Sequence, residues 1–370
     1  MNEPIENNSS PVDQTSFVDV IETILGRPEL DEELAVRLRS VTEYLRQPDE
    51  ASRPFLSVLL RTQGKRIEPL KDAMLCLAAQ TLQDFELIVL EHDALPADVA
   101  GVREVIDRQP PAFRSRIKHL VVDGGTRAKP LNEGIAAAEG HYIAVYDDDD
   151  LVFANWVEEF RDAAIRGDGR LLRSTVATQS ITPEVWPDGS KGFRTGSWPA
   201  AEYPVEFHQL EHLLVNYSPF MSWAFPRSLF FTFGLRFDEV LEVCEDWDMI
   251  LRGSLLCGVE EIEALTAVYR RWEGGASSYT IHSTEAWQRA ERRVLDRINS
   301  STLTLPPGSV TRIRELIGFH QRMEHFESIF RGPYLWFPLR VTLKLAGPPA
   351  HVAVRLRNKV RRALGRGNRK

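Results

Sequence analysis

Four consecutive aspartates, Asp147 to Asp150, form the densest cluster of ionisable side chains in the sequence. Adjacent carboxylates repel one another and raise each other's pKa values unless a cation neutralises them. The apolar segment 142–146 precedes them and predicts that they follow a β-strand. Alternate residues of an extended chain point the same way, so we expect Asp147 and Asp149 to converge on one site. Carboxylate oxygens favour Mg²⁺ or Mn²⁺, ions that often share their ligands with the phosphates of a substrate.

The alternative for this run is a solvated acidic turn that binds nothing. An isolated cluster of aspartates would favour that alternative. Its place directly after a strand favours the metal site, because ligands of parallel sheets bind beyond the carboxyl ends of the strands.

The surrounding segment alternates short apolar runs with stretches of helical spacing. Such alternation predicts βαβ units and a mainly parallel sheet, and the nearly continuous apolar runs predict helices on both of its faces. No Gly-x-Gly-x-x-Gly follows the first strand and no phosphate-loop motif occurs, which argues against a dinucleotide dehydrogenase and a phosphate-loop NTPase. The expected strands are 55–60, 85–90, 117–122 and 142–146, and the expected helices are 70–80, 102–108 and 131–138.

Composition places the chain among globular proteins, with 370 residues, 43% hydrophobic and 26% charged. The net charge of −8 is unevenly spread, because residues 331–370 hold 11 of the 45 basic residues and no acidic ones. The rest of the chain holds 34 basic and 53 acidic residues, which gives it a net charge of −19. An acidic body does not suggest a nucleic-acid-binding protein, whereas a basic tail suits an anionic surface. The three scattered cysteines, the absence of an apolar run of about 18 residues and the polar N-terminus lead us to expect a cytoplasmic protein.

Several motifs resemble segments of family 2 glycosyltransferases in the order and spacing of that family. Residues 140–150, Gly-His-Tyr-Ile-Ala-Val-Tyr-Asp-Asp-Asp-Asp, resemble the strand that ends in Asp-x-Asp-Asp. Residues 244–248, Cys-Glu-Asp-Trp-Asp, resemble the acidic motif that ends the catalytic domain. The remaining matches are the first strand and nucleotide loop at 56–62, a Gln-Thr pair at 80–81, a helix start at 130–134 and a Tyr-Arg strand at 269–270.

This resemblance implies a GT-A type three-layer α/β/α sandwich with a mainly parallel central sheet. The predicted domains are a partly disordered helical extension at 1–52, the GT-A domain at 53–280, and a helical region with a basic tail at 281–370. The metal ion, Mn²⁺ or Mg²⁺, is assigned to Asp147 and Asp149. The nucleotide-sugar is assigned to Arg61, Thr62, Glu91, Arg127, Asp147 and Asp148.

The sequence also departs from the family pattern near the expected donor site. The first loop usually reads Pro-Thr-Tyr-Asn and here reads Arg-Thr-Gln-Gly at 61–64, and the second strand usually ends in Asp-Asp but here ends in Glu-His-Asp at 91–93. The nucleotide base is therefore not predicted. Many members place a histidine two residues after Tyr-Arg, near the metal, where this chain has Trp272; His282 is a weaker candidate ligand.

Glycosyl transfer from a nucleotide-sugar needs positive charge at the departing diphosphate and a base for the acceptor hydroxyl. A metal ion on Asp149 is expected to supply the first, and Arg127 a second cation, although a surface arginine is an equal alternative. Asp246 is our choice of base, worth about 10²- to 10⁴-fold in rate, with Glu245 and Asp248 as alternatives. A single base with in-line displacement gives inversion, as the family resemblance also implies.

The predicted protein is thus a metal-dependent inverting glycosyltransferase acting in the synthesis of cell-surface glycan or polysaccharide. Its expected partners are a nucleotide-sugar donor, a glycan or lipid-linked acceptor and an anionic membrane at the inner face of the plasma membrane, but no nucleic acid. The alternatives are a binding protein that kept the fold without turnover and a metal-dependent phosphoesterase or nucleotidyltransferase. The phosphoesterase alternative leaves the cluster at 245–248 without a role.

Overall fold

The computed structural model describes residues 17–28, 30–46, 53–187, 189, 191–273, 281–301, 303, 305, 308–318 and 321. The chain divides into a first unit, Met1–Pro307, and a second unit, Gly308–Lys370. In the second unit, residues 309–318 and 321 are helical. Among the described residues, no helix is both long enough and apolar enough to cross a lipid bilayer.

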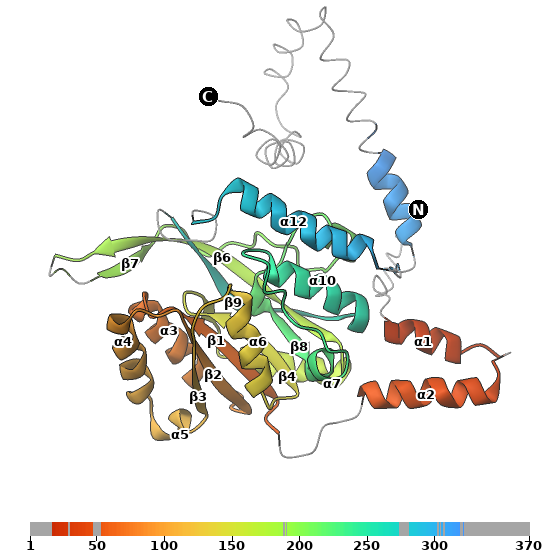
Figure 1. Cartoon of the computed structure of the whole chain (residues 1–370), viewed down its shortest axis with the longest axis horizontal. Helices are drawn as coiled ribbons and strands as arrows, with labels where there is room; N and C mark the ends of the chain where they lie inside the picture. Colours follow the sequence, from red (N-terminus) through yellow and green to blue (C-terminus); the bar gives the residue numbers. More distant parts are fainter. Residues whose placement is uncertain are drawn as a thin grey trace, which may run out of the picture. The chain divides into compact units, whose positions relative to one another are not determined.

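A single mixed sheet forms the centre of the first unit (Figure 1). Its path is β3-β2-β1-β4-β8-β6-β9-β5, and β7 pairs with β6 beyond this path. The pairs of β1 with β2 and β4, β2 with β3, and β6 with β9 are parallel, whereas β8 and β5 run antiparallel to their neighbours. The bounds are β1 Leu56–Thr62, β2 Phe85–His92, β3 Ile117–Val122, β4 Tyr142–Asp147, β5 Leu151–Val152, β6 Leu171–Val185, β7 Lys191–Thr195, β8 Trp223–Pro226 and β9 Val259–Trp272.

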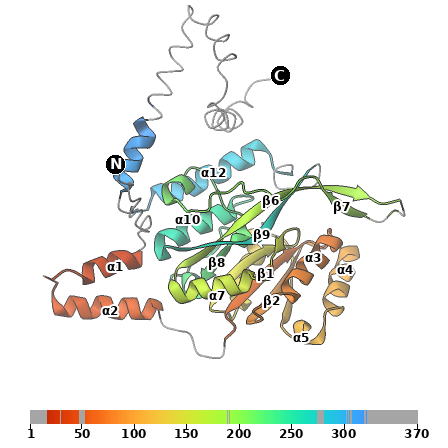
Figure 2. The same cartoon turned by 180° about the vertical axis from the view of Figure 1, so that it is seen from behind.

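Helices cover both faces of this sheet because alternate residues of the strands point to opposite faces. On β1, Val58 joins the apolar cluster that contains Met74, whereas the next residue, Leu59, joins the cluster that contains Ile135. The first face carries α3 (Ile67–Ala78), α4 (Pro96–Asp107), α5 (Pro111–Arg114) and α7 (Trp156–Arg166). The second face carries α6 (Ala128–Ala137), α9 (Arg227–Phe231) and α10 (Glu245–Cys257). Figure 1 shows α6 in front of the sheet, and Figure 2 shows the sheet from behind. The three layers and the mainly parallel sheet confirm the predicted fold class.

A further helix, α12 (Thr284–Asn299), packs on α10. Val294 of α12 lies in a small apolar cluster with Trp247 and Leu251 of α10. This helix lies beyond residue 280 and is part of the first unit. The remaining short elements are α8 (Gln209–His212) and the 3₁₀ turn η1 (Phe220–Ser222), and the N-terminal helices are α1 (Phe17–Leu25) and α2 (Glu32–Arg46).

The order of the strands determines which loops meet. Because β1 lies between β2 and β4 and all three are parallel, their carboxyl ends open at one edge of the sheet. The register sets Arg61 beside Asp147 and Thr62 beside Glu91. The aspartate run that follows β4 therefore lies next to the loop that follows β1.

Candidate active site

One buried arginine connects the two acidic clusters of the sequence. Arg61 donates from Nε and Nη2 to the two carboxylate oxygens of Asp147, at 2.9 and 3.0 Å. Its Nη1 donates to Glu245 Oε1 at 3.1 Å and to the backbone oxygen of Arg127 at 3.1 Å. Only 7% of the Arg61 side chain is exposed. The end of β4 and the start of α10 therefore share this guanidinium.

Arg127 is the second cation of the same group and is more accessible. Its Nε lies 3.3 Å from Glu245 Oε1 and its Nη2 lies 3.8 Å from Asp147 Oδ2, while 34% of its side chain is exposed. Burial alone would raise the pKa values of Asp147 and Glu245, but the charges of Arg61 and Arg127 outweigh it and lower both. Both carboxylates are therefore ionised, and Arg127 keeps an exposed edge that a ligand can reach.

Asp246 has the surroundings that a general base needs. Its Oδ2 accepts a hydrogen bond from Asn216 Nδ2 at 2.9 Å, and its Oδ1 accepts one from the backbone N–H of Trp247 at 2.7 Å. Burial, together with the neighbouring charge of Glu245, raises the pKa of Asp246 to about 6. A carboxylate with such a pKa is mostly ionised at neutral pH and is a stronger base than an ordinary aspartate. Asn216 lies in a loop 30 residues earlier, and no sequence motif indicates it.

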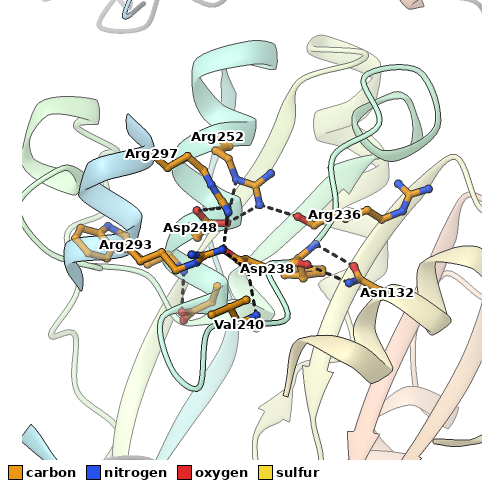
Figure 3. Close-up of polar contacts among 11 residues, drawn as sticks. Asn132, Arg236, Asp238, Val240, Asp248, Arg252, Arg293 and Arg297 are labelled. Carbon is orange, nitrogen blue, oxygen red and sulfur yellow. Dashed lines mark hydrogen bonds and ion pairs between the residues drawn. The ribbon is translucent and has the colours of Figure 1, made fainter. Parts of the chain in front are cut away.

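Asp248, the alternative base, points into a different network (Figure 3). It is fully buried and accepts hydrogen bonds from Arg252 Nε at 3.0 Å and Arg297 Nη1 at 2.8 Å. Arg297 also pairs with Asp238, which Arg293 of α12 contacts as well. These ion pairs fasten α12 to the first turn of α10 and to the loop that contains Asp238.

Two of the four aspartates after β4 are held by uncharged donors. Asp148 Oδ2 accepts a hydrogen bond of 2.5 Å from the hydroxyl of Thr62, whose Oγ1 in turn accepts one from the backbone N–H of Gly64 at 3.0 Å. Asp150 Oδ1 accepts the backbone N–H of Arg270 at 2.8 Å. Burial and the nearby charge of Asp149 raise the pKa of Asp148 to about 7 and that of Asp150 well above its ordinary value.

Asp149 forms an ion pair with Arg66, from the loop between β1 and α3. The guanidinium carbon of Arg66 lies 4.7 Å from the centroid of the Trp272 ring. Asp147 and Asp149 therefore do not share a position, because each carboxylate faces its own arginine. Among the residues that the structure describes, no three His, Cys, Asp or Glu side chains gather as metal ligands.

The carboxylates as arranged do not fit a bound metal ion, and the metal stays a prediction. Arg61 pairs with Asp147 and Arg66 pairs with Asp149, so an arginine side chain already lies beside each of the two expected metal ligands. His282 Nδ1 lies 3.7 Å from Glu242, outside the aspartate run.

Glu91 differs from the other predicted donor-binding residues because its contact is to β3. It is fully buried, and its Oε2 lies 2.8 Å from Nε2 of His119. Its Oε1 has no hydrogen-bond partner within the described part of the chain. The structure thus gathers Arg61, Arg127, Asp147, Glu245 and Asp246 in one group, sets Thr62 and Asp148 beside it, and turns Glu91 toward the neighbouring strand.

Comparison with known proteins found one matching family model and several solved structures of similar fold. Residues 62–229 match the model of the family "Glycosyl transferase family 2". The structure of S. aureus TarS 1–349 in complex with UDP-GlcNAc is 16% identical, has a TM-score of 0.50 and shares 68% of each chain. A second TarS structure is 13% identical with a TM-score of 0.49, over 68% of this chain and 40% of that chain. No curated protein sequence matches the chain.

The matched segment holds β1's last residue, the whole of β2 to β4 and the aspartate run. The likeness to TarS, at this level of identity, concerns the fold, which is the GT-A arrangement expected from the sequence motifs. Residues 62–229 therefore resemble a glycosyl transferase family 2 domain, and the fold is of the GT-A type.

Proposed function

We propose that this protein moves a sugar from a nucleotide-sugar to a hydroxyl group of an acceptor, with inversion at the anomeric carbon. The observation that carries the proposal is the position of Asp246, whose pKa is raised to about 6, one residue after a glutamate that Arg61 links to the end of β4. The base is thereby placed next to the carboxyl edge of the sheet, where ligands of such folds bind. The UDP-GlcNAc complex of TarS supports the donor class.

In the proposed reaction Asp246 accepts the proton of the acceptor hydroxyl. At the same time the oxygen of that hydroxyl forms a bond to the anomeric carbon. The bond between that carbon and the diphosphate oxygen breaks, and its electron pair leaves with the nucleoside diphosphate. Asn216 holds the carboxylate of Asp246 in place through the hydrogen bond at 2.9 Å. Arg127, with its exposed edge, contributes positive charge to the leaving diphosphate.

The donor is proposed to lie over the carboxyl ends of β1, β2 and β4. Thr62, Glu91 and Asp148 remain its proposed contacts there, and Glu91 brings a buried oxygen with spare hydrogen-bonding capacity. Arg61, also a predicted donor contact, holds Asp147 and Glu245 in their positions. Mn²⁺ or Mg²⁺ on Asp147 and Asp149 stays a prediction from the sequence alone, and loss of transfer in EDTA would support it against the arrangement of arginines described above.

The finer parts of the function concern the acceptor and the place of action. We propose a glycan or lipid-linked acceptor in the synthesis of cell-surface polysaccharide, on the cytoplasmic side of the plasma membrane. The support is the charge of residues 331–370, which the sequence alone provides because these residues lie outside the described part of the chain.

A panel of UDP-, GDP- and dTDP-sugars tests the proposed function. A donor present at about 100 times its Kd should add about 2.7 kcal/mol to the free energy of unfolding, which identifies it in a thermal-shift screen. Incubation of that donor with candidate acceptors should then release the nucleoside diphosphate. Stabilisation without release points to a binding protein, and release of nucleoside monophosphate points to a phosphoesterase or nucleotidyltransferase.

A further inference from the structure

Arg66 occupies the place that the sequence analysis gives to a cation. Its guanidinium pairs with Asp149, the aspartate expected to hold the metal ion. It also stacks on Trp272, the residue that stands where many family members have a histidine near the metal. The carboxylate expected to hold the metal ion and the ring that stands in place of the family's histidine are thus both in contact with one arginine.

Arg66 is accessible, in contrast to the arginine that precedes it on β1. The Arg66 side chain is 27% exposed and that of Asp149 is 19% exposed, against 7% for Arg61. Arg61 is enclosed by two carboxylates and a backbone oxygen. The Arg66 side chain is therefore the more accessible of the two arginines to a ligand.

The backbone places Arg66 at the edge where the donor is proposed to bind. It is the N-cap residue of α3, directly before the first turn of that helix. The N-terminus of a helix carries partial positive charge and favours phosphate oxygens. The stacking on Trp272 restricts the guanidinium to one orientation, which lowers the entropy that a flexible arginine loses when it binds an anion.

We propose that Arg66 is the resident cation of this active site and binds the donor's diphosphate in place of a metal ion. The inference rests on the proposed glycosyl transfer. As the bond from the anomeric carbon to the diphosphate oxygen breaks, the electron pair moves onto that oxygen, and Arg66 stabilises the added charge by hydrogen bonds. The acceptor's proton still goes to Asp246, so no further reactant is needed.

The first test measures Mn²⁺ binding to the full chain by the electron paramagnetic resonance signal of the free ion. Wild-type protein should leave the signal of added MnCl₂ unchanged, because Arg66 holds Asp149. Arg66→Gln frees the carboxylate of Asp149 from its ion pair and should take up Mn²⁺. The matched control is Lys65→Gln, which removes a charge from the same loop at an exposed side chain that donates to Gln63, and it should behave as wild type. Stoichiometric Mn²⁺ uptake by the wild-type protein would overturn the inference.

The second test measures the affinity for inorganic pyrophosphate by calorimetry in the presence of EDTA. Wild-type protein should bind it, and Arg66→Gln should bind it about 10- to 100-fold more weakly, the loss expected for a hydrogen bond to a charged group. Arg66→Lys should recover part of the affinity, and a near-UV spectrum reports whether each variant is folded. Pyrophosphate binding that needs Mn²⁺ in the wild type, or that Arg66→Gln leaves unchanged, would refute the role of Arg66.

These outcomes are separable from the fate of the proposed function. Neither test depends on turnover, so the role of Arg66 can be judged before a donor is known. Once a donor is known, transfer by the wild-type protein should persist in EDTA. Transfer that EDTA abolishes would restore the metal while leaving the glycosyltransferase itself in place.

Discussion

Nη1 of Arg61 lies 3.1 Å from Oε1 of Glu245, although the two residues are 184 positions apart in the sequence. The same guanidinium holds both oxygens of Asp147. The segment of β1 to β4 and the helix with the proposed base are therefore joined through one buried side chain. A shift of either segment changes the distance between the donor's expected position and Asp246.

Replacement of Arg61 should destabilise the fold more than the loss of an exposed ion pair does. Arg61→Met would leave the carboxylates of Asp147 and Glu245 without their main buried partner, which typically costs about 3–5 kcal/mol. Urea denaturation measures this free energy of unfolding. The control is Arg37→Met, which breaks an exposed pair with Glu33 and should change stability by at most about 1 kcal/mol. Equal losses for the two variants would contradict the buried connection.

The proposed base predicts a pH profile. Because Asp246 must be deprotonated to accept a proton and its pKa is about 6, kcat/KM should rise with pH up to about 6 and then level off. Asp246→Asn should lower kcat about 10²-fold or more and remove this rise, with donor affinity little changed. Glu242→Gln, an exposed neighbour, is the control. Normal turnover by Asp246→Asn together with inactive Glu245→Gln would give the role to Glu245.

His212 should make the fold sensitive to mild acid. Burial, together with the nearby charge of Arg173, lowers the pKa of His212 to about 3. The unfolded chain binds a proton at about pH 6.5 but the folded chain does not, so this residue reduces stability as the pH falls from 6.5 toward 3. The slope is at most about 1.4 kcal/mol per pH unit.

His212→Phe should remove that slope while keeping an aromatic ring against Phe207 and Trp223. Urea denaturation of wild type and variant at pH 7.5 and pH 5 gives the comparison. His208→Phe, at a partly exposed position, controls for the loss of a histidine. A stability difference between wild type and His212→Phe that stays constant with pH would rule out the buried neutral histidine.

Gly140, two residues before β4, should not accept a side chain. A Cβ there would lie 2.5 Å from the backbone nitrogen of Ser57, closer than real contacts allow. Gly140→Ala should therefore cost about 1–3 kcal/mol, visible as a lower urea midpoint. Gly196→Ala is the matched control, since the nearest atom to its Cβ would lie 3.5 Å away. Similar midpoints for both variants would show that β1 moves aside without cost.

The basic C-terminal segment predicts binding to anionic membranes. Each basic residue near such a surface contributes about 1 kcal/mol, and salt screens the attraction. The full chain should sediment with vesicles containing phosphatidylserine at low salt and release at high salt. A chain that ends at Gly332 should stay in solution and keep its enzymatic activity. Equal binding by both chains would exclude residues 333–370 as the contact.

The sequence predicted the first four strands because each is an apolar run with few polar residues. The strand expected at 117–122 coincides with β3, and the helix expected at 70–80 overlaps α3. β6 escaped prediction because buried polar residues interrupt its apolar pattern. Ser174 of β6 accepts a hydrogen bond of 2.6 Å from Thr266 of β9, a pairing that only the folded sheet provides.

The sequence likewise predicted only those site residues that are clustered along the chain. The aspartate run and residues 245–248 stood out as clusters in the sequence, whereas their arginine partners did not. Arg66 is 83 residues from Asp149, and a loop arginine in an average charged sequence carries no signal of its own. Its partner could be found only once β1 and β4 were known to be neighbours.

The pairing of β6 with β9 limits how this fold can change by recombination. β9 pairs with β6 from Leu171 to Ile181 but lies beyond the segment 62–229 that matches the family model. Recombination that exchanged the matched segment between homologues would bring together two strands that had never been selected as a pair, and would separate Arg61 from Asp147, one of the two carboxylates it holds. New donor or acceptor specificities in this lineage are therefore expected to arise by point substitution within intact chains rather than by shuffling of halves.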